Sequence, residues 1–306
     1  MKAHWSCRVG RVGKASPLWL IALVWFFFAG TYAFADDIYV SLYSSGTILK
    51  FDSNGNQTVF ASGLNRPYGL AFDSSGNLYV ANGGDNTIEK IDTNGVGSLF
   101  ATVDLSVLSD LAFDGSGNLF VSNPLSNTIE RISATRVVSV FANTGLNKPT
   151  GLTFDNSGNL YVANSGDNTI EKFDTNGVGS VLITGLRTPN GLAFDTSGNL
   201  YVANEYPFLT IQTIEKFDTN RVGSWFCTRT PQTSEVGLAF DSGGYLYGAG
   251  GVSVEKFYPN GRGYVLGYAE GSTYLAVQIP EPTTWALVLL GVTVLVGSCR
   301  LRRRSS

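Results

Sequence analysis

The sequence is poor in the residues on which most catalytic chemistry depends. Its 306 residues contain one histidine, His4, and three cysteines, Cys7, Cys227 and Cys299. Because His4 lies in an N-terminal leader, the body of the chain has no imidazole for a general base, a nucleophilic triad or a zinc ligand. Cys227 is the one cysteine of the body, so an intrachain disulfide is excluded there and we expect a buried apolar thiol.

Charge is also scarce, at 15% of residues, and it is unevenly distributed. The two ends of the chain hold eight of the 21 Lys and Arg residues, which leaves residues 36–279 with 13 cations against 23 carboxylates. A body with a net charge of about −10 repels phosphate backbones, so we expect no nucleic-acid partner. Glycine-containing turns are frequent, but none ends in the Gly-Lys-Ser/Thr of a phosphate-binding loop.

The first 35 residues are typical of an export signal. A basic leader precedes an apolar run over residues 18–30, and Ala33-Phe34-Ala35 supplies the small residues that a signal peptidase needs. We therefore predict cleavage before Asp36. An uncleaved N-terminal anchor is the alternative.

The last 27 residues, 280–306, form a second targeting segment. Pro280, Glu281 and Pro282 precede a short apolar stretch over residues 283–298, and a basic cluster with four arginines follows it. This order resembles the PEP-CTERM sorting signal of certain bacteria. The resemblance implies a short membrane helix, recognition by an exosortase-type enzyme, and transfer to the cell surface or to an exopolysaccharide matrix. A plain tail anchor is the alternative, and in both cases the basic end stays cytoplasmic while the body lies outside.

A repeat of about 40 residues fills the region between these ends. The phrase Gly-Leu-Ala-Phe-Asp begins at Gly69, Gly191 and Gly237, with variants at Asp110 and Gly151. A second phrase of the type Leu-Tyr-Val-Ala-Asn follows each copy, and Ile38-Tyr39-Val40 is an additional copy of it. Each unit has four short β-branched or aromatic runs separated by turn residues, which is typical of a propeller blade.

The chain ends predict how the ring closes. Residues 36–279 open on a second strand without a first, and residues 273–278 align with the first-strand phrase. We therefore predict an all-β, six-bladed propeller of four-stranded antiparallel blades, in which the C-terminal strand completes the first blade. Closure would leave few free strand edges.

The blade sequence resembles NHL-repeat propellers and their gluconolactonase-like and streptogramin-lyase-like relatives. The resemblance rests on Gly-Leu-Ala-x-Asp followed by Gly-Asn-Leu-Tyr-Val-Ala, and it covers residues 37–278. It implies the fold and no single activity, since these folds carry lyases, lactonases and binding modules. A streptogramin-lyase-like mechanism rests on histidine, which the body lacks. A gluconolactonase-like metal site needs an early Glu, and residues 38–42 hold no acid. Structural Ca²⁺ remains an option, although the Asp-x-Ser-Gly-Asn turns lack calcium-loop spacing.

Two sets of candidate site residues follow from the repeat. Four asparagines end the second strands and are predicted at the rim of the central channel, where they either ligate or cap their own turns: Asn82, Asn123, Asn164 and Asn204. The unit with two insertions, and the loops that join blades, predict a ligand-binding face formed by Arg66, Tyr68, Lys148, Thr150, Arg187, Asn190, Tyr206 and Phe208.

These observations predict an exported, non-catalytic propeller that binds a glycan or protein ligand, with no catalytic residue and no metal ligand assigned. A divalent-metal lactonase or lyase is the alternative, and a rigid spacer without a ligand is a third possibility. The insertions are equally consistent with drift in a loop without function.

Overall fold

In the computed structural model, the structure describes residues 36–103, 110–206, 211–229 and 237–279. The predicted leader at 1–35, the predicted sorting segment at 280–306 and Phe208 lie outside these residues. Within them, the chain is built from antiparallel strands joined by turns. None of the residues described forms a helix long and apolar enough to cross a membrane.

Four sheets have four strands each, and their order follows the sequence. The first strands are β4 (Pro67–Phe72), β8 (Leu111–Phe113), β12 (Pro149–Phe154) and β16 (Pro189–Phe194). The second strands are β5 (Leu78–Asn82), β9 (Leu119–Asn123), β13 (Leu160–Asn164) and β17 (Leu200–Tyr206). The third strands are β6 (Thr87–Ile91), β10 (Thr128–Ile132), β14 (Thr169–Phe173) and β18 (Ile211–Phe217). The fourth strands are β7 (Gly97–Thr102), β11 (Val138–Ala142), β15 (Gly179–Ile183) and β19 (Gly223–Arg229).

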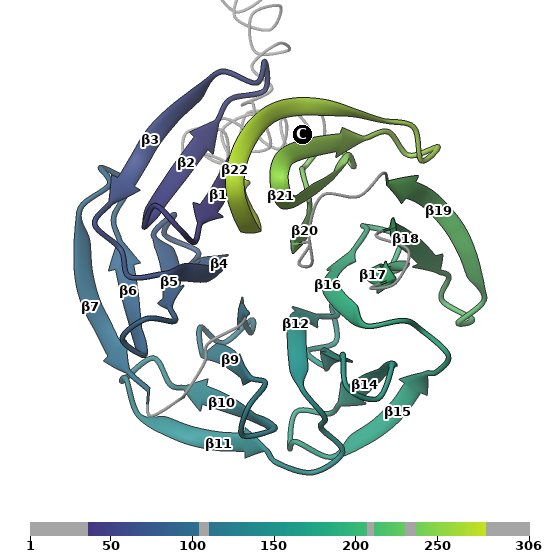
Figure 1. Ribbon diagram of the computed structural model, residues 1–306. Coiled ribbons are helices and arrows are strands. Elements are labelled where there is room, and N and C mark those ends of the chain that lie inside the picture. Colours follow the sequence, from purple (N-terminus) through teal and green to yellow (C-terminus); the bar gives the residue numbers. More distant parts are fainter. Residues whose placement is uncertain (1–35, 104–109, 207–210, 230–236, 280–306) are drawn as a thin grey trace, which may run out of the picture. The chain divides into compact units, whose positions relative to one another are not determined.

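The fifth sheet has six strands, so the structure has five blades and the predicted count of six is wrong. Its order is β20 (Gly237–Phe240), β21 (Leu246–Phe257), β22 (Gly263–Gln278), β1 (Asp37–Leu42), β2 (Thr47–Phe51) and β3 (Gln57–Ser62). The segments that the repeat assigns to a fifth and a sixth blade are thus united in one sheet, which curves strongly along β21 and β22 (Figure 1).

Ser272 lies at the point where this sheet continues from one half to the other. Three other first strands begin with proline, which has no N–H to donate and interrupts a ladder. Ser272 stands at the corresponding point of β22 and is the register partner of both Gly251 in β21 and Leu42 in β1. The sixteen-residue strand β22 therefore passes from one partner to the other without a break.

Closure of the ring occurs as the sequence predicts. The last residues of β22 pair antiparallel with β1, with Asp37 opposite Gln278 and Val40 opposite Leu275. The inner strands β4, β8, β12, β16, β20 and β22 contact one another in turn, and β22 contacts β4. Buried apolar clusters lie between successive sheets, and one lies between the two halves of the six-stranded sheet.

The turns have the chemistry that their sequences predict. Asp73 accepts hydrogen bonds from the amides of Ser75 and Asn77, each at 2.9 Å, and Gly76 has a φ of 78°. Asp92 holds the turn between the third and fourth strands in the same way. These local bonds fix the strand register, so each blade presents its loops at constant positions.

Candidate functional site

Two kinds of connection meet on one face of the propeller, which we call the loop face. The connection between blades carries Arg66, whose carbonyl accepts the amide of Gly83 in the turn between the second and third strands, at 3.0 Å. The carbonyl of Lys148 accepts the amide of Ser165 in the same manner, at 3.2 Å. The loop face is therefore a set of paired loops that are hydrogen-bonded to each other.

The predicted binding residues divide into an exposed and a buried group on this face. Arg66, Lys148 and Arg187 are exposed, and Arg66 and Lys148 adopt positive φ values of 55° and 49°. Asn190 is buried, and the Thr150 hydroxyl lies 3.0 Å from the carbonyl of Pro189 in the next blade, so Thr150 joins two blades.

One cluster on the loop face combines a cation with two aromatic rings. The guanidinium of Arg66 lies 5.8 Å from the ring centroid of Tyr43, and the rings of Tyr43 and Tyr68 are 5.0 Å apart. Both tyrosines are half-buried. Gly83 makes room for Tyr68, because a Cβ at Gly83 would lie 2.8 Å from that ring. Sequence reasoning missed Tyr43, which follows β1 at the position that Gly83, Pro124, Ser165 and Glu205 occupy after the other second-strand phrases.

The insertion that carries two further candidates extends the blade. Strands β17 and β18 each have seven residues, and Tyr206 pairs with Ile211 at the end of this extension. Tyr206 thus lies at the last position of β17, at the end of that blade where the loop face lies.

The four asparagines are buried inside their blades, and none is among the residues that line the central cavity. Asn123 accepts the amides of Leu125 and Ser126, so it caps its own turn. Asn164 and Asn204 instead donate to glutamates of the third strands, Glu171 at 3.2 Å and Glu215 at 3.0 Å. These asparagines hold the second and third strands together.

The central cavity has a volume of about 510 Å³ and is lined mainly by apolar side chains of the first strands. Thr153, Thr196, Asp241 and Ser242 also line it, and so does Asp110, which replaces the repeat's glycine. Its Oδ1 accepts the amide of Leu111 and its Oδ2 accepts the amide of Leu152 in the next blade, both at 2.8 Å. Burial raises the pKa of Asp110 from 3.8 to about 7, against the lowering effect of these two bonds.

Sequence reasoning noted the change of Gly to Asp at position 110 but did not assign it a role. A break in a repeated glycine is the signal that points to it. At Gly151, a Cβ would lie 2.0 Å from the carbonyl oxygen of Asn190, so side chains are normally excluded from this point. Asp110 is tolerated because its carboxyl group bridges to the next strand.

The oxygen donors present do not fit a divalent metal. The described residues contain no group of three or more His, Cys, Asp and Glu side chains that could hold one ion. Both carboxylate oxygens of Asp110 are already engaged by backbone amides. Calcium prefers six to eight oxygen ligands, and Asp110 has no carboxylate oxygen left without a backbone partner to offer it.

The opposite ends of the blades carry a repeated Asp-Tyr-Lys cluster that sequence reasoning missed. In the β12–β15 blade, Lys172 lies 3.3 Å from Asp155 and 5.1 Å from the ring centroid of Tyr161. Three other blades or blade halves repeat the cluster with Asp73-Tyr79-Lys90, Asp195-Tyr201-Lys216 and Asp241-Tyr247-Lys256. The signal was a constant spacing of six residues between Asp and Tyr.

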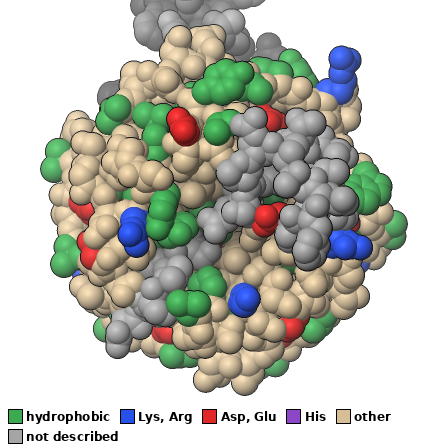
Figure 2. All heavy atoms as spheres, viewed as in Figure 1, with side chains coloured by type: hydrophobic (Ala, Val, Ile, Leu, Met, Phe, Trp, Pro, Cys, Tyr) green, Lys and Arg blue, Asp and Glu red, His purple; other side chains and the backbone are tan. Residues whose placement is uncertain are grey.

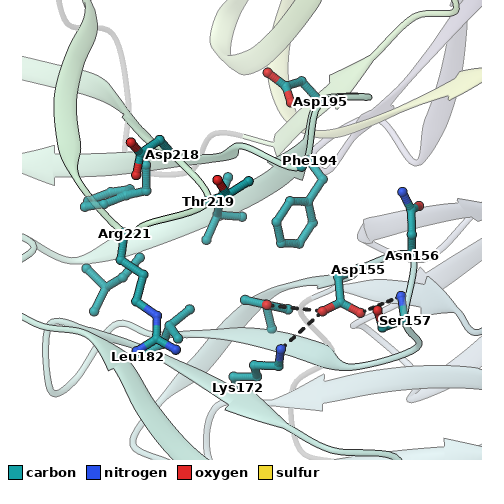
Figure 3. A pocket seen from close by; sticks show the side chains of 15 residues that line it. Asp155, Asn156, Ser157, Lys172, Leu182, Phe194, Asp195, Asp218, Thr219 and Arg221 are labelled. Atoms are coloured by element: carbon teal, nitrogen blue, oxygen red, sulfur yellow. Dashed lines mark hydrogen bonds and ion pairs between the residues drawn. The ribbon is translucent and has the colours of Figure 1, made fainter.

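A second cavity of about 330 Å³ lies beside one of these clusters, between the β12–β15 and β16–β19 sheets. Asp155, Tyr161 and Lys172 line it from the first sheet, and Phe194 and Arg221 line it from the second (Figure 3). The turns that line this cavity lie on the face of the propeller opposite the loop face.

Comparison with known protein families gives a match for one segment of the chain. Residues 146–173 match the NHL repeat. This NHL repeat contains strands β12, β13 and β14. The corresponding strands of the other blades have similar sequences. No curated protein matches the chain.

Solved structures with similar folds include enzymes of two kinds by their titles. A streptogramin B lyase is 14% identical, with a TM-score of 0.58 and coverage of 75% of this chain and 78% of that one. A putative gluconolactonase is 18% identical, with a TM-score of 0.58 and coverage of 73% and 82%. A gluconolactonase from Xanthomonas campestris is 16% identical, with a TM-score of 0.56 and coverage of 82% and 86%. Likeness at this identity shows the propeller fold alone.

Proposed function

We propose that this protein is an exported, non-catalytic binding propeller of the cell surface or extracellular matrix, which holds a glycan or protein ligand on its loop face. In this proposal the leader at 1–35 directs export. The Pro280-Glu281-Pro282 segment engages an exosortase-type enzyme, and the tail anchors the chain in the inner membrane at least transiently.

The observation that carries the binding role is the cluster of Arg66, Tyr43 and Tyr68. Aromatic rings offer a large apolar surface to the faces of sugar rings, and a neighbouring guanidinium supplies hydrogen-bond donors for hydroxyl groups. Hydrogen bonds between loops hold the cluster in place, since Arg66 is tied to Gly83 through its carbonyl. A ligand would therefore meet a preformed surface, which lowers the entropic cost of binding.

The other cations of the loop face extend this surface around the ring. Lys148 and Arg187 occupy the connections of two further blades and are exposed. Among the described residues on the face turned toward the viewer in Figure 2, charged side chains stand apart from one another. Such spacing favours an extended ligand with several weak contacts over a small ligand in one deep site, so we favour a polysaccharide.

The test is binding of the exported protein to an array of neutral and acidic bacterial oligosaccharides. Tyr43→Ala and Tyr68→Ala remove the two rings and should each weaken binding at least tenfold. Tyr268→Ala is the matched control, because Tyr268 is 72% exposed on β22 and outside the cluster. Equal binding by all three variants would refute the role of the cluster, and binding to a protein extract but to no oligosaccharide would redirect the proposal to a protein ligand.

The metal-dependent alternative is tested separately. Calorimetric titration with Ca²⁺ and Zn²⁺ should show no stoichiometric site. Micromolar binding at one site would replace the present proposal with a lactonase or lyase activity.

Export and sorting need their own measurement. Intact-mass analysis of the native protein after cell fractionation should give a mature N-terminus at Asp36 in a surface or matrix fraction. A cytoplasmic protein with residues 1–35 retained would contradict the proposed location.

A further inference from the structure

An aromatic sandwich recurs at the turn-side edge of the blades. The ring of Tyr79 in β5 lies 4.8 Å from Phe100 in the fourth strand of its own blade and 4.9 Å from Phe113 in the next blade, both edge to face. The same three-ring arrangement recurs around Tyr39, Phe120 and Tyr201. Each sandwich fills the gap between two neighbouring blades.

Two of the repeat units lack the ring of the fourth strand: β22 carries Leu266 at this position, and β15 carries Leu182. Tyr161 in β13 has Phe194 of the next blade at 4.8 Å, but the fourth strand of its own blade carries Leu182 where four others carry phenylalanine. The four phenylalanines at this position are Phe60, Phe100, Phe141 and Phe226. The cavity of about 330 Å³ lies at this place, with Leu182 in its wall.

A second residue beside this cavity also differs from the repeat. The turn between the third and fourth strands has a glycine with positive φ in four cases, Gly55, Gly95, Gly177 and Gly261. The β16–β19 blade has Arg221 there instead, with a φ of 68°. A long side chain in this left-handed conformation is uncommon.

Arg136 shows what an arginine at this position does in a complete sandwich. It has a φ of 65°, and its guanidinium lies 5.2 Å from the ring centroid of Phe100 in the preceding blade. Arg221 has Leu182 in the place of that ring, and within the described residues its side chain makes no hydrogen bond, ion pair or ring contact. Arg221 points across the cavity toward Leu182, and Lys172 and Phe194 line other sides of it (Figure 3).

We propose that this cavity binds an uncharged aromatic ring, which lies beside Leu182, between Tyr161 and the guanidinium of Arg221. The ring would meet Tyr161 edge to face and receive a cation–π contact from Arg221. Leu182, Ile183 and Phe217 form the apolar part of the wall.

The charges around the cavity select against an anionic ring. Three carboxylates, Asp155, Asp195 and Asp218, line it, against the two cations Lys172 and Arg221. Lys172 is already paired with Asp155 at 3.3 Å. A phenol or a tyrosine side chain therefore suits the cavity better than an aromatic carboxylate. This site is on the face opposite the loop face and is independent of the glycan proposal.

The probes are phenol and N-acetyltyrosinamide, titrated into the full-length protein and followed by NMR or calorimetry. Cyclohexanol and benzoate are the comparison compounds. At least one aromatic probe should bind saturably at one site, at least tenfold more tightly than either comparison compound. Binding of phenol alone would indicate a free small molecule as the natural ligand, and tighter binding of N-acetyltyrosinamide would indicate a side chain of a partner protein.

The variants restore the repeat, so they are expected to fold. Leu182→Phe fills the cavity and should abolish binding, and Arg221→Gly should weaken it about fivefold. Arg136→Gly is the matched control in an already complete sandwich and should leave binding unchanged.

Three results would overturn the proposal: no saturable binding of either aromatic probe, equal binding of cyclohexanol, or unchanged binding in Leu182→Phe with an unaltered melting temperature. Were Leu182→Phe unstable, Arg221→Gly compared with Arg136→Gly would decide in its place.

Discussion

Asp110→Gly should abolish most of the pH dependence of stability near neutrality. The folded carboxyl group keeps its proton up to a pKa of about 7, whereas in the unfolded chain it ionises near 3.8. The folded state therefore binds more protons between these values, and its stability falls as pH rises through this window. At about 1.36 kcal/mol per pKa unit, the total loss is about 4.4 kcal/mol, of which about 2.6 kcal/mol falls between pH 5 and pH 8.

The assay is thermal unfolding by calorimetry at pH 5, 6, 7 and 8, on the native protein and on the variant. For a domain of this size, about 2.6 kcal/mol corresponds to a fall in Tm of about 5–10 °C. The variant carries the glycine that the repeat has elsewhere, so its Tm should fall much less over this range. The turn aspartates do not interfere, because turn hydrogen bonds lower the pKa values of Asp73, Asp155 and Asp195 despite their partial burial.

Subtracting the two profiles isolates Asp110 from the glutamates whose pKa burial also raises, Glu171, Glu205 and Glu215. No histidine in residues 36–279 titrates in this window. If both proteins lost stability equally between pH 5 and pH 8, the reasoning about the buried carboxyl group would be refuted.

Three further predictions concern packing, a buried hydrogen bond and closure. Gly151→Ala places a Cβ 2.0 Å from a backbone oxygen and should lower stability by about 1–3 kcal/mol, whereas Gly115→Ala meets nothing within 4 Å and should change it by less than about 1 kcal/mol in denaturant unfolding. Tyr247→Phe removes the buried 3.0 Å bond to Asp241 and should cost about 1–2 kcal/mol by the same measurement, with no change in secondary structure by circular dichroism. Deletion of residues 273–278 removes the partner of β1 and should give aggregates or oligomers in size-exclusion chromatography; a soluble monomer with unaltered melting would contradict the closed ring.

Local features of the fold were predictable from the sequence because the turns encode them. The Asp-x-Ser-Gly-Asn and Asp-x-Asn-Gly segments carry their own hydrogen bonds, and the alignment of residues 273–278 with a first strand predicted the pairing with β1. The number of sheets was not predictable from the repeat count, because it depends on whether a ladder breaks between units. Here the ladder continues at Ser272.

The candidate sites were predicted less completely than the fold. Sequence spacing placed Arg66 and Tyr68 on the loop face, but it could not show that Tyr43, from another blade element, lies against both. The asparagines recur in the sequence as a ligand set would, yet their side chains serve the strands beside them. Each aromatic sandwich combines rings from two neighbouring blades. The replacement of a ring by Leu182 could therefore be recognised only in the structure.

The pairing of Asp37 with Gln278 makes the starting point of the ring interchangeable. A hairpin turn of a few residues could link these two partners, and the chain could then be opened at the turn of any other blade. Such circular permutants should reach the same propeller, and they would free the two present ends for fusion to other domains.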